Sequence, residues 1–258
     1  MLMKIVLQKA RVKLLQMHYS AGVGHIGGNF SCIDTLITLY HSIMTPDDRF
    51  VLSKGHSAGA LYVALWSVGI LSDLDLETFC QDGTTLSGHP SREVPGVLFS
   101  TGSLGHGASL SSGLALAARH QGSSRRIFCL CSDGEWQEGS NWEALIFSVH
   151  NRLENLAIMV DQNGWQGFGR TGDVASMFDL CSRFESFGAK TVSVDGHDLH
   201  AIAAALRIRE PGKPTVIVLR TRKGCGLHFE NCLESHYLPL TRDQYVAACA
   251  AISSEVLS

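Results

Sequence analysis

Five short apolar runs, separated by longer segments with helical periodicity, constrain the fold of this chain more than any other feature. The runs are Arg49–Leu52, Ile127–Cys131, Leu156–Val160, Lys190–Val194 and Thr215–Leu219. Most are continuously apolar, which is typical of strands covered on both faces. We therefore predict an α/β fold, doubly wound, with a mainly parallel sheet, helices on both faces and a ligand site at the carboxyl ends of the strands.

Composition and charge exclude several classes of protein. Apolar residues make up 45% and charged residues 17% of the 258 positions, which is typical of a globular chain with one sizeable core. The formal charge of −3 gives no strong attraction to nucleic acid or to an anionic membrane. The first nineteen residues read as a helix rather than a signal peptide, and no apolar stretch is long enough to span a bilayer. The eight cysteines are scattered without a CxxC pair, so we expect reduced thiols in a cytoplasmic protein.

Two glycine-rich loops lead into helical patterns. Residues 22–28 precede the helix-like segment Ser31–Ser42, for which Ser31 is the candidate N-cap, and residues 102–107 precede Ala108–Arg119. A glycine loop at a helix N-terminus can present backbone N–H groups to an anion or a flat ring. Neither loop has the spacing of a P-loop or a dinucleotide fingerprint. An ordinary structural turn is the alternative for each.

Two oxygen-bearing side chains follow neighbouring candidate strands. Asp133 comes just after the second run and Asn163, thirty residues later, just after the third, with a helical pattern between them. A crossover of that length makes the two strands neighbours and brings both side chains to one edge of the sheet. One carboxylate, one amide oxygen and a backbone carbonyl suit Mg²⁺ or Ca²⁺ that also holds phosphate oxygens. The alternative is that both side chains only cap helices or turns.

The same residues lie in motifs that resemble a known family. The run SDGEWQEG (132–139), followed by Asn163-Gly164, resembles the GDG…N motif of thiamine-diphosphate enzymes. The form DGxxxEGxxxEA, with Glu138, Glu143 and Ala144, is similar to the transketolase family. Further runs agree in order and spacing: GHIGGNFS (24–31), RFVLSKGH (49–56), GHP (88–90), PGVLFSTGSLGHG (95–107), VDGHD (194–198) and KGCG…H (223–236). They cover nearly the whole chain, so the resemblance is to the N-terminal domain of transketolases, which binds the cofactor diphosphate, as a single domain over residues 1–258.

The resemblance implies a set of site residues. The Mg²⁺ or Ca²⁺ that bridges the cofactor phosphates would be held by Asp133, Asn163 and the main-chain oxygen of Trp165. The residues implied to contact thiamine diphosphate are His56, Gly102, Leu104, Gly134 and Asn163. Those implied to act in catalysis are the substrate-facing imidazoles His25, His89 and His236, together with Glu138, which with Glu143 resembles the carboxylates of the dimer interface. Imidazoles suit proton transfer because their pKa lies near working pH, and the thiazolium ring would delocalise the carbanion left when a ketose C2–C3 bond breaks.

Departures from the family pattern bear on assembly and activity. Ser132 replaces the first glycine of GDG, and Ser103 and His106 replace the proline and glutamine of the family's GPLGQG loop. The 258 residues hold no counterpart of the family's pyrimidine-binding domain or C-terminal domain. We therefore expect one component of a split transketolase, self-associating through the cofactor domain and completed by a separate C-terminal subunit in an α₂β₂ assembly.

The sequence leaves other functions open. The chain could belong to another thiamine-diphosphate enzyme, such as a deoxyxylulose-phosphate synthase or a 2-oxoacid dehydrogenase component, or be a non-catalytic scaffold subunit. As a transketolase it would move a two-carbon ketol unit from a ketose or ketose phosphate to an aldose. The candidates for contacts to a substrate phosphate are Lys54, Arg92, Arg170 and Arg222.

Overall fold

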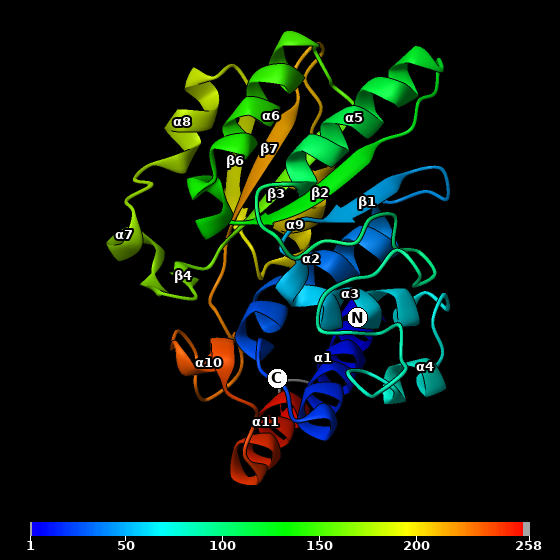
Figure 1. Cartoon of the computed structure of the whole chain (residues 1–258), viewed down its shortest axis with the longest axis vertical. Helices are drawn as coiled ribbons and strands as arrows, with labels where there is room; N and C mark the ends of the chain where they lie inside the picture. The colour runs from blue at the N-terminus through cyan, green and yellow to red at the C-terminus, as the bar shows by residue number, and fades with distance from the viewer. Residues whose placement is uncertain (1, 255–258) are drawn as a thin grey trace.

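A five-stranded, fully parallel sheet forms the centre of the computed structural model, which describes residues 2–254 (Figure 1). The strands are β1 (Arg49–Leu52), β2 (Ile127–Ser132), β3 (Leu156–Gln162), β6 (Lys190–Asp195) and β7 (Thr215–Arg220), in the spatial order β1-β2-β3-β7-β6. All five coincide with the apolar runs, to within two residues at their ends. The predicted pairing of β2 with β3 is confirmed, with Ile127 opposite Leu156 and Ser132 opposite Asp161.

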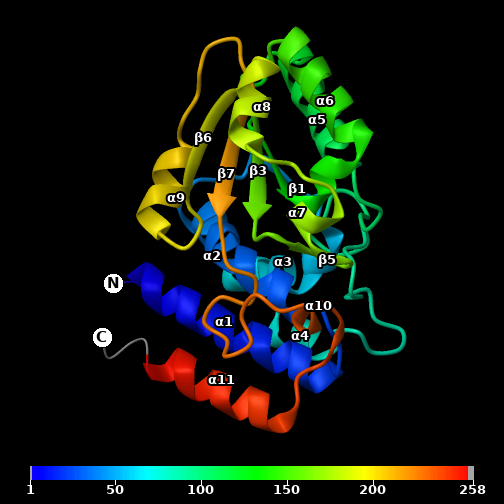
Figure 2. The same ribbon diagram turned by 90° about the vertical axis from the view of Figure 1, so that its left-hand side faces the viewer.

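Helices cover both faces of this sheet, so the doubly wound fold is confirmed (Figure 2). Side chains alternate along β2: Phe128 and Leu130 join one apolar cluster, whereas Cys129 and Cys131 join the other. The first cluster packs against α1 (Leu2–Ala21), α2 (Ile26–Ser42), α3 (Ala58–Ser67), α9 (Leu199–Leu206) and α11 (Arg242–Ser254). The second packs against α5 (Gly107–His120), α6 (Gly139–His150) and α8 (Leu180–Ser186).

Short elements lie in the connections between these layers. They are the 3-10 turns η1 (Gly55–Ser57) and η2 (Gly134–Gln137), the helices α4 (Asp73–Glu77), α7 (Thr171–Val174) and α10 (Glu234–Tyr237), and the hairpin of β4 (Trp165–Gln166) with β5 (Gly169–Arg170). Figure 2 shows α1 and α11 side by side at the end of the molecule toward which the strands point. No helix within residues 2–254 is both long and apolar enough to cross a membrane.

The start of α2 differs from the sequence prediction. The helix begins at Ile26 rather than near Ser31, and its N-cap position is His25, at φ 64° and without a side-chain capping bond. Ser31 is not an N-cap: it is buried inside the helix, where its hydroxyl donates to the Gly28 carbonyl and to Asp161. The first turn contains Gly27, where a Cβ would lie 2.3 Å from the Ser235 hydroxyl, so this position has no space for a larger residue.

The connections leave β3 and β7 toward opposite faces of the sheet. After β3 the chain runs to α8, in the second apolar cluster, whereas after β7 it runs to α10 and α11, beside α1. Adjacent strands whose connections diverge in this way leave a crevice at their carboxyl ends, where open α/β sheets bind ligands. Asp161 on β3, Asn163 just after it and Thr221 just after β7 lie at these carboxyl ends, where Asn163 and Thr221 both donate to Asp161.

Candidate active site

Four histidine rings from four separate segments converge at the carboxyl edge of the sheet. The ring centroid of His25 lies 5.8 Å from that of His56, 5.9 Å from that of His89 and 5.0 Å from that of His236. The His56 and His236 centroids are 5.6 Å apart. The structure therefore brings together all four imidazoles that were singled out in the sequence.

Buried hydrogen bonds fix the loops that carry these rings. The Asn29 amide donates to the backbone carbonyls of His25, at 2.8 Å, and His56, at 3.3 Å, while its oxygen accepts from the N–H of Ala60. The N–H of His25 donates to the His236 carbonyl at 3.0 Å. His25 has a left-handed backbone, which is uncommon for a residue with a β-carbon and persists where surrounding contacts impose it.

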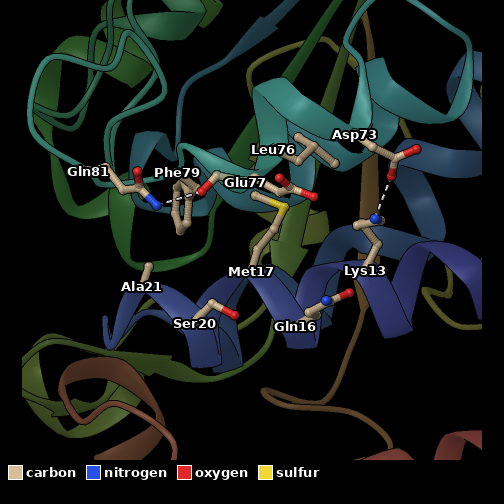
Figure 3. Close-up of a pocket in the computed structure, with 10 residues that line it drawn as sticks. All are labelled: Lys13, Gln16, Met17, Ser20, Ala21, Asp73, Leu76, Glu77, Phe79 and Gln81. Carbon is tan, nitrogen blue, oxygen red and sulfur yellow. Dashed lines mark hydrogen bonds and ion pairs between the residues drawn. The ribbon is translucent and has the colours of Figure 1, made fainter.

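A cavity of about 340 Å³ opens beside the rings and extends toward α1. Its lining includes His25, His56 and His89, together with His18, Phe79 and Cys80. Figure 3 shows a different and smaller hollow, of about 90 Å³, between α1 and α4, where Lys13 faces Asp73 and Met17 points toward Leu76. The ten residues lining that hollow include none of the four histidines. Of the two, the larger cavity is the one joined to the histidine cluster.

Burial keeps the clustered imidazoles neutral near pH 7. Burial, with the charges of His89 and Lys223, lowers the pKa of His25 to about 4. Burial, Lys223 and His25 lower the pKa of His236 to about 3. The pKa values of His56 and His89 are lowered too, chiefly by burial. Neutral imidazoles can accept a proton from a hydroxyl or share a hydrogen bond with a carbonyl oxygen.

Asp133 and Asn163 meet at the crevice, as their spacing predicted. One Asp133 oxygen accepts the Gly134 N–H at 2.8 Å, and the other accepts the Gly164 N–H at 2.8 Å and the Thr171 hydroxyl at 3.2 Å. The Asn163 amide group donates to Asp161 at 3.0 Å, and its oxygen accepts the Trp165 N–H at 3.0 Å. Asp133 therefore caps the turn that follows it, as the alternative interpretation of the sequence had it. It is also buried at the carboxyl edge of the sheet.

The charge balance around Asp133 fits a bound cation. Burial and the nearby Asp161 raise the pKa of Asp133 to about 6, against the effect of its three donors. Within residues 2–254, no lysine, arginine or histidine forms an ion pair with this carboxylate. No three His, Cys, Asp or Glu side chains of those residues converge as a metal cluster either. One buried carboxylate with amide and carbonyl oxygens nearby is a donor set for a hard cation that keeps other oxygen ligands.

A buried ion pair lies between the carboxylates and the histidines. The Lys54 ammonium contacts Asp161 and donates to the Gly28 carbonyl at 3.0 Å, and both charged side chains are fully buried. Burial alone would lower the pKa of Lys54, but Asp161 outweighs it and the pKa is raised. Lys54 is therefore a buried structural cation instead of a surface contact for a substrate phosphate.

Lys223 is a site residue that the sequence did not indicate. Its ammonium lies 2.9 Å from Nδ1 of His236. Burial and the Lys54 charge lower its pKa to about 8. The signal available in the sequence was a lysine directly before the first glycine of the KGCG run, close to His236. Lys223 therefore adds a positive charge beside the crevice, whereas the Lys54 charge is offset by Asp161.

Gly24 has no room for a side chain. A Cβ on Gly24 would lie 2.4 Å from the Tyr237 carbonyl oxygen, a backbone atom that cannot move aside without moving its segment. At Gly134 a Cβ would lie 2.4 Å from the end of the Gln166 side chain, which can move away, and at Gly102 it would lie 3.0 Å from the His89 ring. Close backbone packing at Gly24 therefore helps to set how the loop that carries His25 packs against the segment that carries His236.

The remaining predicted residues are exposed or half-buried and do not line the 340 Å³ cavity. Glu138 and Glu143 are exposed, and Glu138 is the N-cap residue of α6, beside Gly105. Leu104 is half-buried, and His106 is exposed with Nδ1 3.0 Å from the Ser103 carbonyl. Glu135, also missed in the sequence, is buried and accepts the N–H groups of Gly105 and Ser132 at 3.0 and 3.1 Å, which joins the second glycine loop to the end of β2.

The arginines considered for a substrate phosphate do not converge. Arg92 and Arg170 are exposed, and the Arg170 guanidinium lies 5.3 Å from the centre of the Trp165 ring. Arg222 pairs with Glu230 at 3.3 Å. None of these arginines lines the 340 Å³ cavity.

Comparison with known proteins agrees with this geometry. Residues 4–252 match the family described as transketolase, thiamine diphosphate binding domain. The chain is 36% identical to an apulose-4-phosphate transketolase subunit of Phocaeicola vulgatus, over 96% of this chain and 93% of that protein. It is 38% identical to a 6-deoxy-6-sulfo-D-fructose transketolase subunit of Clostridium sp., over 91% of this chain and 90% of that protein. A solved transketolase from Leishmania mexicana superposes with a TM-score of 0.91 at 27% identity, over 97% of this chain and 41% of that one.

Proposed function

Because this chain belongs to the transketolase family, as a thiamine-diphosphate-dependent N-terminal subunit, we propose specific roles for the residues gathered at its crevice. The observation that carries the proposal is the position of four neutral imidazoles beside a buried carboxylate and amide at the carboxyl edge of the sheet. This arrangement supports a site that holds a diphosphate at one end and moves protons at the other.

The diphosphate end comprises Asp133, Asn163 and the Trp165 carbonyl as the Mg²⁺ ligands. A divalent cation would offset the buried charge of Asp133, whose raised pKa reflects the cost of leaving that carboxylate uncompensated. Gly134 and His56 would contact the cofactor phosphates, with Lys223 adding positive charge. Gly102 and Leu104 would border the cofactor rings.

The proton-transfer end is the cluster of His25, His89 and His236. Thiamine diphosphate supplies the electron sink for cleavage of the ketose C2–C3 bond. The protein must then accept the proton of the donor hydroxyl and hydrogen-bond to the acceptor carbonyl. The lowered pKa values of His25 and His89 keep both rings unprotonated and able to accept a proton at Nε2 or Nδ1. Lys223 holds Nδ1 of His236, which orients that ring toward His25.

A second subunit would complete the site. Two relatives named as apulose-4-phosphate transketolase subunits align with this chain along more than nine-tenths of their length, which supports a separate partner subunit. Phe168, Tyr237 and Leu238 lie on the segments beside the crevice and expose 88%, 55% and 56% of their surface, an apolar rim suited to such a partner. We place Glu138 and Glu143 at contacts between two copies of this chain, in an α₂β₂ assembly, with cytoplasmic location.

The substrates we propose are a ketose donor and an aldose acceptor, free or phosphorylated. Relatives are named for apulose 4-phosphate and for 6-deoxy-6-sulfo-D-fructose, so modified sugars with an anionic group are within the range of this group of proteins. Because the candidate arginines here do not line the cavity, we assign recognition of the substrate's anionic group to the partner subunit.

The direct test is Asp133→Ala, compared with Asp173→Ala as an exposed control on α7. Calorimetry on the complex with its C-terminal subunit should show loss of thiamine diphosphate and Mg²⁺ binding for Asp133→Ala only. Ketol transfer should be lost in parallel. Unchanged activity in Asp133→Ala would favour a scaffold role for this chain.

A further inference from the structure

Glu135 is a buried carboxylate to which neither the proposed metal site nor the histidine cluster assigns a role. It lies in the turn η2, two residues after Asp133, and none of its surface is exposed. A carboxylate that is removed from water needs hydrogen-bond donors to stabilise its charge. The donors around Glu135 therefore identify the parts of the fold that it holds together.

The three donors to Glu135 come from three different segments. Oε1 accepts the hydroxyl of Ser53, which directly follows β1, and the N–H of Gly105, in the second glycine loop, at 3.0 Å. Oε2 accepts the N–H of Ser132, at the end of β2, at 3.1 Å. The hydroxyl oxygen of Ser53 accepts in turn the N–H of Gly107, the first residue of α5, at 3.0 Å. One carboxylate thus joins the carboxyl ends of two strands to the loop between α4 and α5.

The second glycine loop is held from its other side by the same segment of chain. The Gly105 carbonyl accepts the Ser140 hydroxyl at 2.7 Å. A Cβ on Gly105, which has φ 87°, would lie 2.6 Å from that hydroxyl oxygen. Glu135 and Ser140 both follow Asp133 within seven residues, and they bind the N–H and the carbonyl of one glycine. The loop therefore cannot shift without losing contacts to the segment that begins at Asp133.

We propose that Glu135 is a positioning residue, which holds the second glycine loop at a fixed distance from the Asp133 turn and so preforms the space for thiamine diphosphate. This inference rests on the proposed function, in which Asp133 binds the metal of the diphosphate and Gly102 and Leu104 border the cofactor rings. Both ends of one cofactor would then contact these two segments, so their separation must match its length. Because Glu135 is fully buried, it acts only through the groups that donate to it.

Replacement of the carboxylate by an amide removes one of these contacts and keeps the size of the side chain. In Glu135→Gln the amide oxygen can still accept from Ser53 and Gly105, but the NH2 group then faces the Ser132 N–H. Two donors in contact leave a buried N–H without an acceptor, which is costly. The Asp133 turn therefore moves away from the amide, while the glycine loop keeps its own hydrogen bond.

The first test measures backbone hydrogen exchange by mass spectrometry in the purified chain without cofactor. Glu135→Gln should speed exchange in the peptide that covers residues 132–134 by about ten-fold, because the turn loses its acceptor. Ser53→Ala, a milder variant that also removes the acceptor of the Gly107 N–H, should speed exchange over residues 102–107 instead. Wild-type exchange rates in both variants would overturn the inference, whatever the function of the chain.

Asn155→Ala is the matched control for a general loss of stability. Asn155 is buried directly before β3, at the end of the sheet opposite to the crevice, and its amide donates to two backbone carbonyls at 3.0 and 3.3 Å. Its removal should lower the thermal midpoint of unfolding, as Glu135→Gln does, and leave exchange over residues 132–134 at the wild-type rate.

The second test uses the complex with the C-terminal subunit. Glu135→Gln should raise the calorimetric Kd and the KM for thiamine diphosphate by about ten-fold, with kcat at saturating cofactor within about two-fold of the wild type, because the bound cofactor restores the turn. Asn155→Ala should keep the wild-type Kd. Lower thermal midpoints in both variants with an unchanged Kd in both would show a merely structural role and overturn the inference. Absence of cofactor binding by the wild-type complex would contradict the proposed function instead, and the exchange test does not depend on it.

Discussion

Removing the Lys54 ammonium should destabilise this protein more than removing any surface lysine. Lys54 and Asp161 are both fully buried and in direct contact, and Asp161 also accepts from Ser31 and Asn163. In Lys54→Met the methionine side chain fills most of the space of the lysine methylene groups, but the Asp161 carboxylate stays buried without its cation. Breaking one partner of a buried pair costs about 3–5 kcal/mol of unfolding free energy.

The assay is urea unfolding at pH 7, followed by circular dichroism, on four variants. Lys190→Met is the matched control, because Lys190 pairs with Glu210 at 3.7 Å with both side chains over one-third exposed, and it should cost under about 1 kcal/mol. Asp161→Asn should cost a similar amount to Lys54→Met. The double variant Lys54→Met/Asp161→Asn should lose about 2 kcal/mol less unfolding free energy than the sum of the two single losses. In the double variant neither charge is left buried without its partner.

The result that refutes this reasoning is a loss for Lys54→Met no larger than that for Lys190→Met. Additive losses in the double variant would equally show that the two charges do not stabilise each other. Either outcome would place Lys54 in contact with solvent or with another partner.

Two further predictions concern the site itself. The pKa of His25 is about 4 in the folded chain against 6.5 when unfolded, so as pH falls from 6.5 to 4 the unfolded chain binds a proton that the folded chain does not, and stability falls. Urea unfolding of His25→Asn over this range should show a slope flatter by up to about 1 kcal/mol per pH unit; an unchanged slope would mean that His25 is solvated. Gly24→Ala should lower the unfolding free energy by about 1–3 kcal/mol, because its Cβ would meet the Tyr237 carbonyl oxygen at 2.4 Å. Gly113→Ala, in open space on α5, should instead raise it by up to about 1 kcal/mol, and equal effects of the two would contradict the close packing at Gly24.

Strand positions and the meeting of Asp133 with Asn163 followed from local sequence, because a parallel sheet turns order along the chain into order in space. Continuous apolar runs mark strands that are buried on both faces, and a helix-length crossover leaves few alternatives for which strands pair. The convergence of the four histidines, by contrast, came from the family resemblance, since their sequence separation carries no information about distance.

What the sequence did not show depends on tertiary contacts. Ser31 has the residue type of an N-cap, but α2 begins five residues earlier, at Ile26, and its first turn packs Gly27 against Ser235, a residue more than two hundred positions away in the sequence. The sequence places Lys54 just after a predicted strand, but it does not show that the Lys54 ammonium contacts Asp161, because only the tertiary fold brings the two together.

The central claim is that this chain supplies the diphosphate and metal half of a transketolase site that a second subunit completes. Ketol transfer should be measured for the chain by itself, for its C-terminal partner by itself and for the two mixed, each with thiamine diphosphate and Mg²⁺. We predict activity only in the mixture. Full ketol transfer by the purified 258-residue chain without its partner would contradict the claim.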